Sequence, residues 1–135
     1  MPGYLIVEPL APCQGLADLD ADQAADLLKC LAAAEAATVD LIEPARVYVL
    51  KFGEENPRLH FHVVPRTERI RAGYLSEVRD EKPYSGARIA DWIWQRHETL
   101  GFTDDEVERF VRSARARLNP APRRRATESA SPDDS

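Results

Sequence analysis

Leu59-His60-Phe61-His62-Val63-Val64-Pro65-Arg66 is the stretch that decides the fold and points to the chemistry of this chain. Its alternating pattern predicts a strand over residues 59–64 that ends at Pro65. Successive side chains of a strand point to opposite faces, so His60 and His62 share one face while the apolar residues around them face the core. Two neighbouring imidazoles are costly to bury without partners, and this pair is therefore the first candidate site.

The segments before this strand complete a predicted hairpin and a small sheet. Val47-Tyr48-Val49-Leu50-Lys51-Phe52 is rich in β-branched and aromatic residues, which favours a strand. Residues 53–57 have the length and composition of a hairpin connection. Tyr4-Leu5-Ile6-Val7 is a short apolar run that is closed by Pro9, and it predicts a further buried strand.

Three helices are predicted from capping residues and from apolar stripes at helical spacing. A capping box that begins at Asp20 predicts a long amphipathic helix to about residue 40. A second, short helix is expected at about residues 88–98, and a third begins after Thr103 at another capping box. The charged stretch 66–83 has no clean periodicity, and no element is predicted there.

The second predicted helix carries two tryptophans that cannot share one environment. Trp92 and Trp94 lie about 200° apart around a helix, so both cannot point into the core. One of them is expected to wall a pocket or an interface, or to pack on a loop. His97, near the end of the same helix, is expected at the surface, where a protonated ring suits the helix dipole.

Composition and charge describe one acidic globular domain. The 135 residues carry 18 Lys and Arg against 23 Asp and Glu, a net charge of -5, which argues against a nucleic-acid groove. No apolar run approaches the roughly 18 residues of a membrane helix and the N-terminus does not resemble a secretion signal, so a cytoplasmic protein is expected. Residues 1–118 are predicted to form the domain and residues 119–135 a disordered tail. Cys13 and Cys30 are expected to be free thiols.

The histidine pair leaves more than one interpretation open. His-x-His on a strand suits a metal ion when a third ligand is near, and Glu54 or Glu55 in the preceding turn is a candidate. The pair can also be two partly exposed strand histidines without a function. The residues around the pair favour a third interpretation.

Residues 59–66 resemble the end of the histidine-triad (HIT) signature, His-φ-His-φ-His-φ-φ, which is often followed by Pro-Arg. The resemblance extends upstream through Pro2–Pro9, which is similar to the strand that leads into the family's central helix, and through Leu16–Asp20, and it covers about residues 2–66. It implies an α+β fold: a HIT-like antiparallel sheet with a long central helix and C-terminal helices. It also implies a homodimer. The family's strands that normally precede the first strand do not appear in this sequence, so either the true start lies upstream of Met1 or the chain is a shortened member.

The chemistry that the resemblance implies is nucleotide chemistry. HIT proteins bind nucleotides and commonly hydrolyse or transfer nucleoside monophosphate groups through a nucleotidyl-histidine, and the attacking histidine corresponds to His60. The third signature histidine, which holds and neutralises the phosphate, corresponds to His62. Asn56 and Arg58 are the candidate substrate-binding residues beside them. The implied partner is a nucleotide or dinucleoside polyphosphate, and neither a metal ion nor another cofactor is implied.

Departures from the family pattern support an alternative from another functional class. The first signature histidine is replaced by Arg58, which cannot shuttle a proton at neutral pH. Glu54 and Glu55 stand where the family often has neutral polar residues, and carboxylates there repel a phosphate. Tyr4 stands where the family often has histidine. The alternative is a catalytically impaired HIT-like module that binds nucleotides or other proteins.

Overall fold

One antiparallel sheet lies at the centre of the protein, in a computed structural model that describes residues 1–119. The middle strand is β3 (Phe61–Arg66), with β1 (Leu5–Val7) on one side and β2 (Arg46–Leu50) on the other. His62 lies opposite Ile6 of β1 and Leu50 of β2, so its backbone occupies the centre of the sheet. β2 and β3 pair antiparallel across one loop, which confirms the predicted hairpin.

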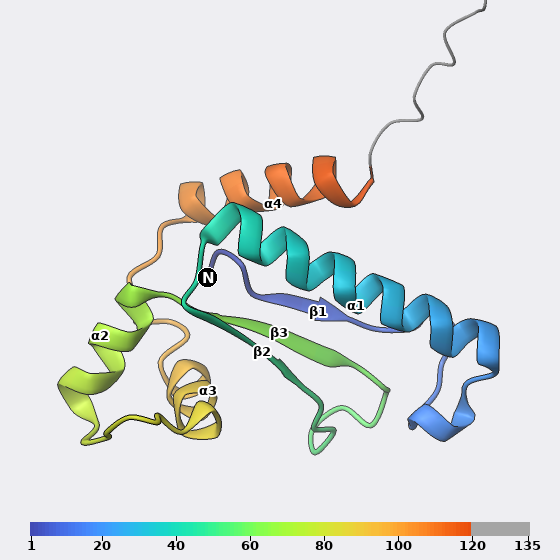
Figure 1. The fold of residues 1–135 in the computed structure, drawn as a ribbon, viewed down its shortest axis with the longest axis horizontal. Helices are drawn as coiled ribbons and strands as arrows, with labels where there is room; N and C mark the ends of the chain where they lie inside the picture. Colours follow the sequence, from blue (N-terminus) through green and yellow to red (C-terminus); the bar gives the residue numbers. More distant parts are fainter. Residues whose placement is uncertain (120–135) are drawn as a thin grey trace, which may run out of the picture.

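The helices cover both faces of this sheet. Their bounds are Ala21–Ile42 (α1), Glu68–Glu77 (α2), Gly86–Gln95 (α3) and Asp104–Leu118 (α4), with a short 3-10 turn at Leu16–Asp18. Figure 1 shows α1 and α4 stacked on one side of the sheet, with α3 on the other side and α2 beside it. The α+β class, the long central helix and the C-terminal helices are therefore confirmed.

α1 is fixed at its start by its own side chains and along its length by small residues. Asp20 accepts a hydrogen bond from the backbone N–H of Gln23, and the Gln23 side chain accepts one from the N–H of Asp20. This is the predicted capping box. Ala34, Ala37 and Thr38 are buried, and their small size allows the helix to lie close to the sheet.

Gly3 ties the start of the chain to α1 and so sets the path of the residues that follow. Its φ is 82°, a left-handed conformation that favours glycine. A Cβ there would lie 2.8 Å from Ile42 and 2.9 Å from Pro65. The Gly3 carbonyl accepts a hydrogen bond from the buried Thr38 hydroxyl at 3.1 Å. Tyr4 therefore enters the site region from a fixed backbone.

The opposite face of the sheet carries the main core, between β3, α2 and α3. Trp92 belongs to it and is 8% exposed, so it is the core member of the tryptophan pair. Gly73 in α2 lies against the Trp92 ring, where a Cβ would come within 2.9 Å of the ring edge. The buried members of this core are Val64, Ile70, Tyr74, Ile89, Trp92 and Ile93.

α4 is capped as its sequence predicts and packs on α1. Thr103 and Glu106 form the expected capping box, and the first turn is acidic while the last is basic, as the helix dipole favours. Phe110 is buried on its inner face. Arg117 near its end forms an ion pair with Asp40 of α1.

The histidine strand differs from its predicted bounds of 59–64. β3 begins at Phe61, so His60 lies one residue before the strand, and it continues through Pro65, which pairs with Val47. A proline is tolerated here because β1 pairs with β3 only as far as Val63. Beyond that point no strand of the described chain needs the missing N–H on that side.

The stretch 66–83 contains a helix that the periodicity does not predict. α2 buries only Ile70 and Tyr74, and it carries Gly73 in its middle, so its apolar stripe is too short to detect. Thr67 caps its start through the N–H of Ile70. The helix expected at 88–98 begins and ends slightly earlier, as α3, because Ser85 caps it.

The remaining sequence predictions concern membrane helices, cysteines, the homodimer, the location and the C-terminal tail. No described helix is long and apolar enough to cross a membrane. Cys13 and Cys30 are both free. The homodimer and the cytoplasmic location remain predictions, and the tail predicted from residue 119 lies, from 120 on, outside the described residues.

Candidate functional site

The two histidines open into a cavity of about 590 Å³. It lies where the start of β1, the β2–β3 loop and the end of α3 meet. Its lining residues are Tyr4, Phe52, Gly53, Glu54, Glu55, Asn56, His60, His62, Trp94 and His97. Three segments that are far apart in the sequence therefore build one site.

His60 is held by contacts with the backbone that precedes it. Leu59 is 2% exposed, and its N–H donates to the carbonyl of Cys13 at 2.7 Å, which fixes the chain just before the histidine. The Nδ1 atom of His60 lies 2.7 Å from the carbonyl oxygen of Arg58. That contact fixes the ring, and among residues 1–119 its Nε2 atom has no hydrogen-bond partner.

His62 lies beside His60, with ring centroids 4.9 Å apart, so the predicted shared face is confirmed. The Nδ1 atom of His62 lies 2.6 Å from the hydroxyl oxygen of Tyr4. That hydroxyl also accepts a hydrogen bond from the indole N–H of Trp94 at 2.8 Å. In the described chain the Nε2 atom of His62 has no hydrogen-bond partner either.

Burial shifts the titration of this polar cluster. Burial lowers the pKa of His62, because the imidazolium loses solvation, and the neighbouring charge of His60 lowers it further. Burial raises the pKa of Tyr4, and the hydrogen bond from Trp94 opposes that effect in part. Both shifts favour the uncharged form of these two side chains at neutral pH.

Aromatic side chains form one wall of the cavity. The rings of Phe52 and Trp94 meet edge to face at 5.5 Å, and Trp94 meets His62 at 5.5 Å. Phe52 is 51% exposed, so an apolar surface remains open to a flat ring. Trp94 is therefore the tryptophan that lines a pocket, which is one of the positions the sequence predicts for it.

The charge around the cavity is acidic. Glu54 and Glu55 line it, and no Lys or Arg is among its lining residues in the described chain. Arg58 contributes its carbonyl to His60, but its side chain is exposed and does not line the cavity. Asn56 lines the cavity, and its side-chain oxygen accepts the Arg58 N–H at 3.1 Å. The structure therefore brings Asn56 to the histidines and leaves the Arg58 side chain apart.

The arrangement does not form a metal site within the described residues. No group of three His, Cys, Asp or Glu side chains in residues 1–119 is arranged to hold a metal ion. Glu54 and Glu55 lie at the same cavity as the histidine pair but do not complete a ligand set with it. The metal interpretation of the histidine pair therefore gains no support.

His97 is a cavity residue that the sequence analysis assigned to a surface role. α3 ends at Gln95, and the chain turns so that His97 lies at the rim, with its side chain 72% exposed. Its Nδ1 atom lies 2.9 Å from the Trp94 carbonyl. The surface prediction holds, but the turn that brings this residue to the cavity has no signal in the helical pattern.

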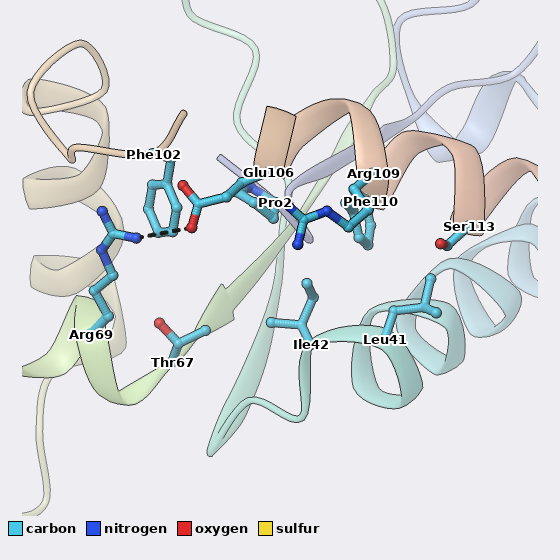
Figure 2. A pocket seen from close by; sticks show the side chains of 10 residues that line it. All are labelled: Pro2, Leu41, Ile42, Thr67, Arg69, Phe102, Glu106, Arg109, Phe110 and Ser113. Carbon is cyan, nitrogen blue, oxygen red and sulfur yellow. Dashed lines mark hydrogen bonds and ion pairs between the residues drawn. The ribbon is translucent and has the colours of Figure 1, made fainter. Parts of the chain in front are cut away.

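A second cavity, of about 420 Å³, lies where α1, α2 and α4 meet (Figure 2). Leu41, Ile42, Phe102 and Phe110 give it an apolar lining. Arg69 is its best-connected charge: it pairs with Glu106 at 3.3 Å. It also stacks on the Phe102 ring at 4.1 Å and donates to the carbonyls of Leu100 and Gly101.

Comparison with known proteins identifies a fold. No family model and no curated protein matches the chain. A solved structure from Bartonella henselae, described as a Hit-like protein involved in cell-cycle regulation with an unknown ligand, is similar to it with a TM-score of 0.51. The match covers 86% of this chain and 70% of that one at 18% identity. The chain therefore has a HIT-like α+β fold.

Proposed function

We propose that the protein transfers a nucleoside monophosphate group from a nucleotide to water or to another acceptor, with His60 as the nucleophile. The observation that carries the proposal is the 2.7 Å contact between the Nδ1 atom of His60 and the Arg58 carbonyl. A carbonyl oxygen is only an acceptor, so the Nδ1 atom must carry the proton. The neutral ring then has its lone pair on Nε2.

A lone pair on Nε2 is what a nucleophilic histidine requires. The atom has no hydrogen-bond partner in residues 1–119, and its ring lines an open cavity. The backbone contact on the other nitrogen holds the ring in place and stabilises the positive charge that develops when Nε2 forms a bond. His97 has a similar Nδ1 contact with the Trp94 carbonyl but lies at the exposed rim, whereas His60 lies beside His62.

The reaction has two displacement steps. In the first, Nε2 of His60 bonds to the α-phosphorus while the bond from that phosphorus to the leaving group breaks. The leaving group keeps the electron pair of that bond and takes up one proton from the solvent. In the second, water attacks the same phosphorus while the P–N bond breaks and its electron pair returns to Nε2. The second step releases nucleoside monophosphate and one proton.

The cavity lining bears on the kind of nucleotide. Phe52 and Trp94 offer aromatic surface for stacking a base, at about 1–3 kcal/mol per stacked base. Glu54 and Glu55 repel anionic groups. A substrate with one phosphate, such as an adenosine phosphoramidate, therefore suits this rim better than a dinucleoside polyphosphate, although both present the same α-phosphate to His60.

The test uses both substrates. Release of AMP is followed from an adenosine phosphoramidate and from a dinucleoside polyphosphate, with His60→Ala as the variant and His97→Ala as a matched control at the rim of the cavity. Turnover that is lost in His60→Ala and kept in His97→Ala, together with a nucleotidyl adduct on His60 in acid-free mass spectrometry, supports the proposal. Equal turnover in wild type and His60→Ala overturns it.

A second candidate function is nucleotide binding without turnover. The observation in its favour is the absence of Lys and Arg from the described lining of the cavity, since phosphoryl transfer depends on charge stabilisation. It predicts that AMP raises the melting temperature of the wild type, that Trp94→Ala abolishes this shift, and that neither substrate is consumed.

A further inference from the structure

A chain of hydrogen bonds joins three distant segments at the inner end of the cavity. The indole N–H of Trp94, from α3, donates to the Tyr4 hydroxyl at 2.8 Å, and that hydroxyl lies 2.6 Å from Nδ1 of His62. Both contacts are partly buried. Tyr4 lies close to the N-terminus of the protein, where Gly3 fixes the backbone against α1.

The donor and acceptor capacities of the three side chains fix the direction of both hydrogen bonds. An indole N–H is a donor only, so Tyr4 must accept from Trp94. The hydroxyl has one proton of its own, and in the described chain its partner as a donor is Nδ1 of His62. Nδ1 of His62 is then an acceptor, and the proton of the neutral ring lies on Nε2.

The opposite arrangement leaves groups unsatisfied. With a proton on Nδ1 of His62, the Tyr4 oxygen would accept two hydrogen bonds, and its own partly buried proton would lack an acceptor. A buried donor without a partner costs about 1–3 kcal/mol. The Nε2 lone pair of His62 would also face the cavity beside that of His60 and would repel a phosphate oxygen.

We infer that Tyr4 and Trp94 are positioning residues that hold His62 in the tautomer with its proton on Nε2, opposite to the tautomer of His60. The two adjacent rings then present different groups to the cavity: a lone pair from His60 and an N–H donor from His62. The donor is placed to bind a phosphate oxygen or to protonate a leaving group. The structural part of this inference stands alone, and its catalytic consequence rests on the proposed function.

The surroundings of His62 are consistent with a neutral ring. The titratable groups that face it are His60 and Tyr4, and Glu54, Glu55 and His97 lie further around the same cavity. Trp94, the nearest side chain of α3, is uncharged. Burial and His60 both lower the pKa of His62, so a neutral ring is favoured at pH 7.

Ring-nitrogen NMR on the full chain tests the tautomers directly. In 15N-labelled protein at pH 7.5, His62 is expected to show a protonated Nε2 and an unprotonated Nδ1, and His60 the reverse. In Tyr4→Phe and in Trp94→Phe, His62 is expected to move towards a mixture of tautomers. A His62 with its proton on Nδ1 in the wild type, or one unchanged in both variants, overturns the inference.

Steady-state kinetics supply the second readout. Tyr4→Phe is expected to lower kcat about tenfold with little change in KM, the scale typical of losing a group that orients a functional histidine. Tyr84→Phe is the matched control, because it removes a partly buried hydroxyl that contacts Arg71 away from the cavity. Trp94→Phe keeps an aromatic ring, although a smaller one, and removes the indole donor, so it remains informative if Tyr4→Phe fails to fold.

The two readouts separate this inference from the proposed function. The expected tautomers in a protein without turnover would overturn the nucleotide chemistry and support the positioning role. Turnover that depends on His60, but with kcat and His62 shifts unaffected by Tyr4→Phe and Trp94→Phe, would support the chemistry and overturn the positioning role.

Discussion

The histidine cavity and the cavity between α1, α2 and α4 have volumes of about 590 and 420 Å³. They differ in whether their polar side chains are fully hydrogen-bonded within the protein. In the second, Arg69 is paired with Glu106 beside Phe102 (Figure 2), and it also stacks on the Phe102 ring and donates to backbone carbonyls. In the first, His60 and His62 are each anchored through Nδ1, and their Nε2 atoms have no partner in residues 1–119.

This difference separates a structural cluster from a reactive one. The contacts of Arg69 connect α2 to the segment before α4 and to α4 itself, so its charge holds elements together. The contacts of His60 and His62 use one nitrogen of each ring, and the other nitrogen of each ring stays available for a ligand. The volumes of the two cavities do not distinguish them, whereas the hydrogen-bond partners of their polar atoms do.

The largest effect is expected from removing the His60 imidazole. His60→Ala should lower kcat/KM for an adenosine phosphoramidate by about a thousandfold or more, because it removes the Nε2 atom on which the proposed covalent intermediate forms. The free energy of unfolding should change by no more than about 0.5 kcal/mol, because the ring is only partly buried. Kinetics and urea titration measure the two quantities, and a large loss of stability would assign His60 a structural role.

The reverse pattern is expected in the other cavity. Arg69→Ala should lower the free energy of unfolding by about 1–2 kcal/mol, since it removes an ion pair, hydrogen bonds to two carbonyls and a cation–π contact. Turnover at a temperature where the variant is folded should match the wild type. Arg109→Ala, in the same cavity, serves as the control for loss of a nearby positive charge. A turnover defect in Arg69→Ala alone would contradict the division between the two cavities.

A smaller effect is expected from neutralising the acidic rim. The double variant Glu54→Gln and Glu55→Gln should raise kcat/KM for a dinucleoside polyphosphate about tenfold at low ionic strength, and less in salt, because exposed charges are screened. The value for a phosphoramidate should change much less, since that substrate carries less negative charge. Equal gains for both substrates would show that the carboxylates act on something other than phosphate charge.

Much of the histidine cavity is predictable from local patterns, and the rest depends on contacts between distant segments. Strand alternation places His60 and His62 on one face, and the 4.9 Å between their rings confirms it. Helical spacing separates Trp92 from Trp94, but it does not say which one enters the core. The meeting of Tyr4 with His62 and Trp94 has no local signal, because it depends on how α3 packs on the sheet.

The fold shows the same limit. The capping boxes predict the starts of α1 and α4, because those hydrogen bonds lie within four residues of the chain. α2 escapes prediction because Gly73 interrupts its pattern, and the Trp92 ring that packs against this glycine comes from another helix. The continuation of β3 through Pro65 depends on how far β1 extends, which the histidine segment itself does not encode.

The smallest expected effect is a change in the titration of His62. Its pKa lies below the ordinary value of 6.5 because of burial first and the charge of His60 second. His60→Ala removes the second cause and, because the two rings are in contact, also exposes His62 to more solvent, so the pKa of His62 should rise towards 6.5, as measured by NMR titration of the ring. Tyr84→Phe, outside the cavity, should leave it unchanged.

The sign of this shift also fixes its effect on stability. Because the folded pKa of His62 is the lower one, the unfolded chain takes up the proton first as the pH falls below about 6.5, and the folded state loses stability through that window. The loss of stability that His62 causes should be smaller in His60→Ala, because its folded pKa then lies closer to its unfolded pKa. A His62 pKa that falls in His60→Ala would mean that the two imidazoles do not repel each other as neighbouring charges. The two rings could then not be treated as one coupled histidine pair, in contrast to the paired charge of Arg69.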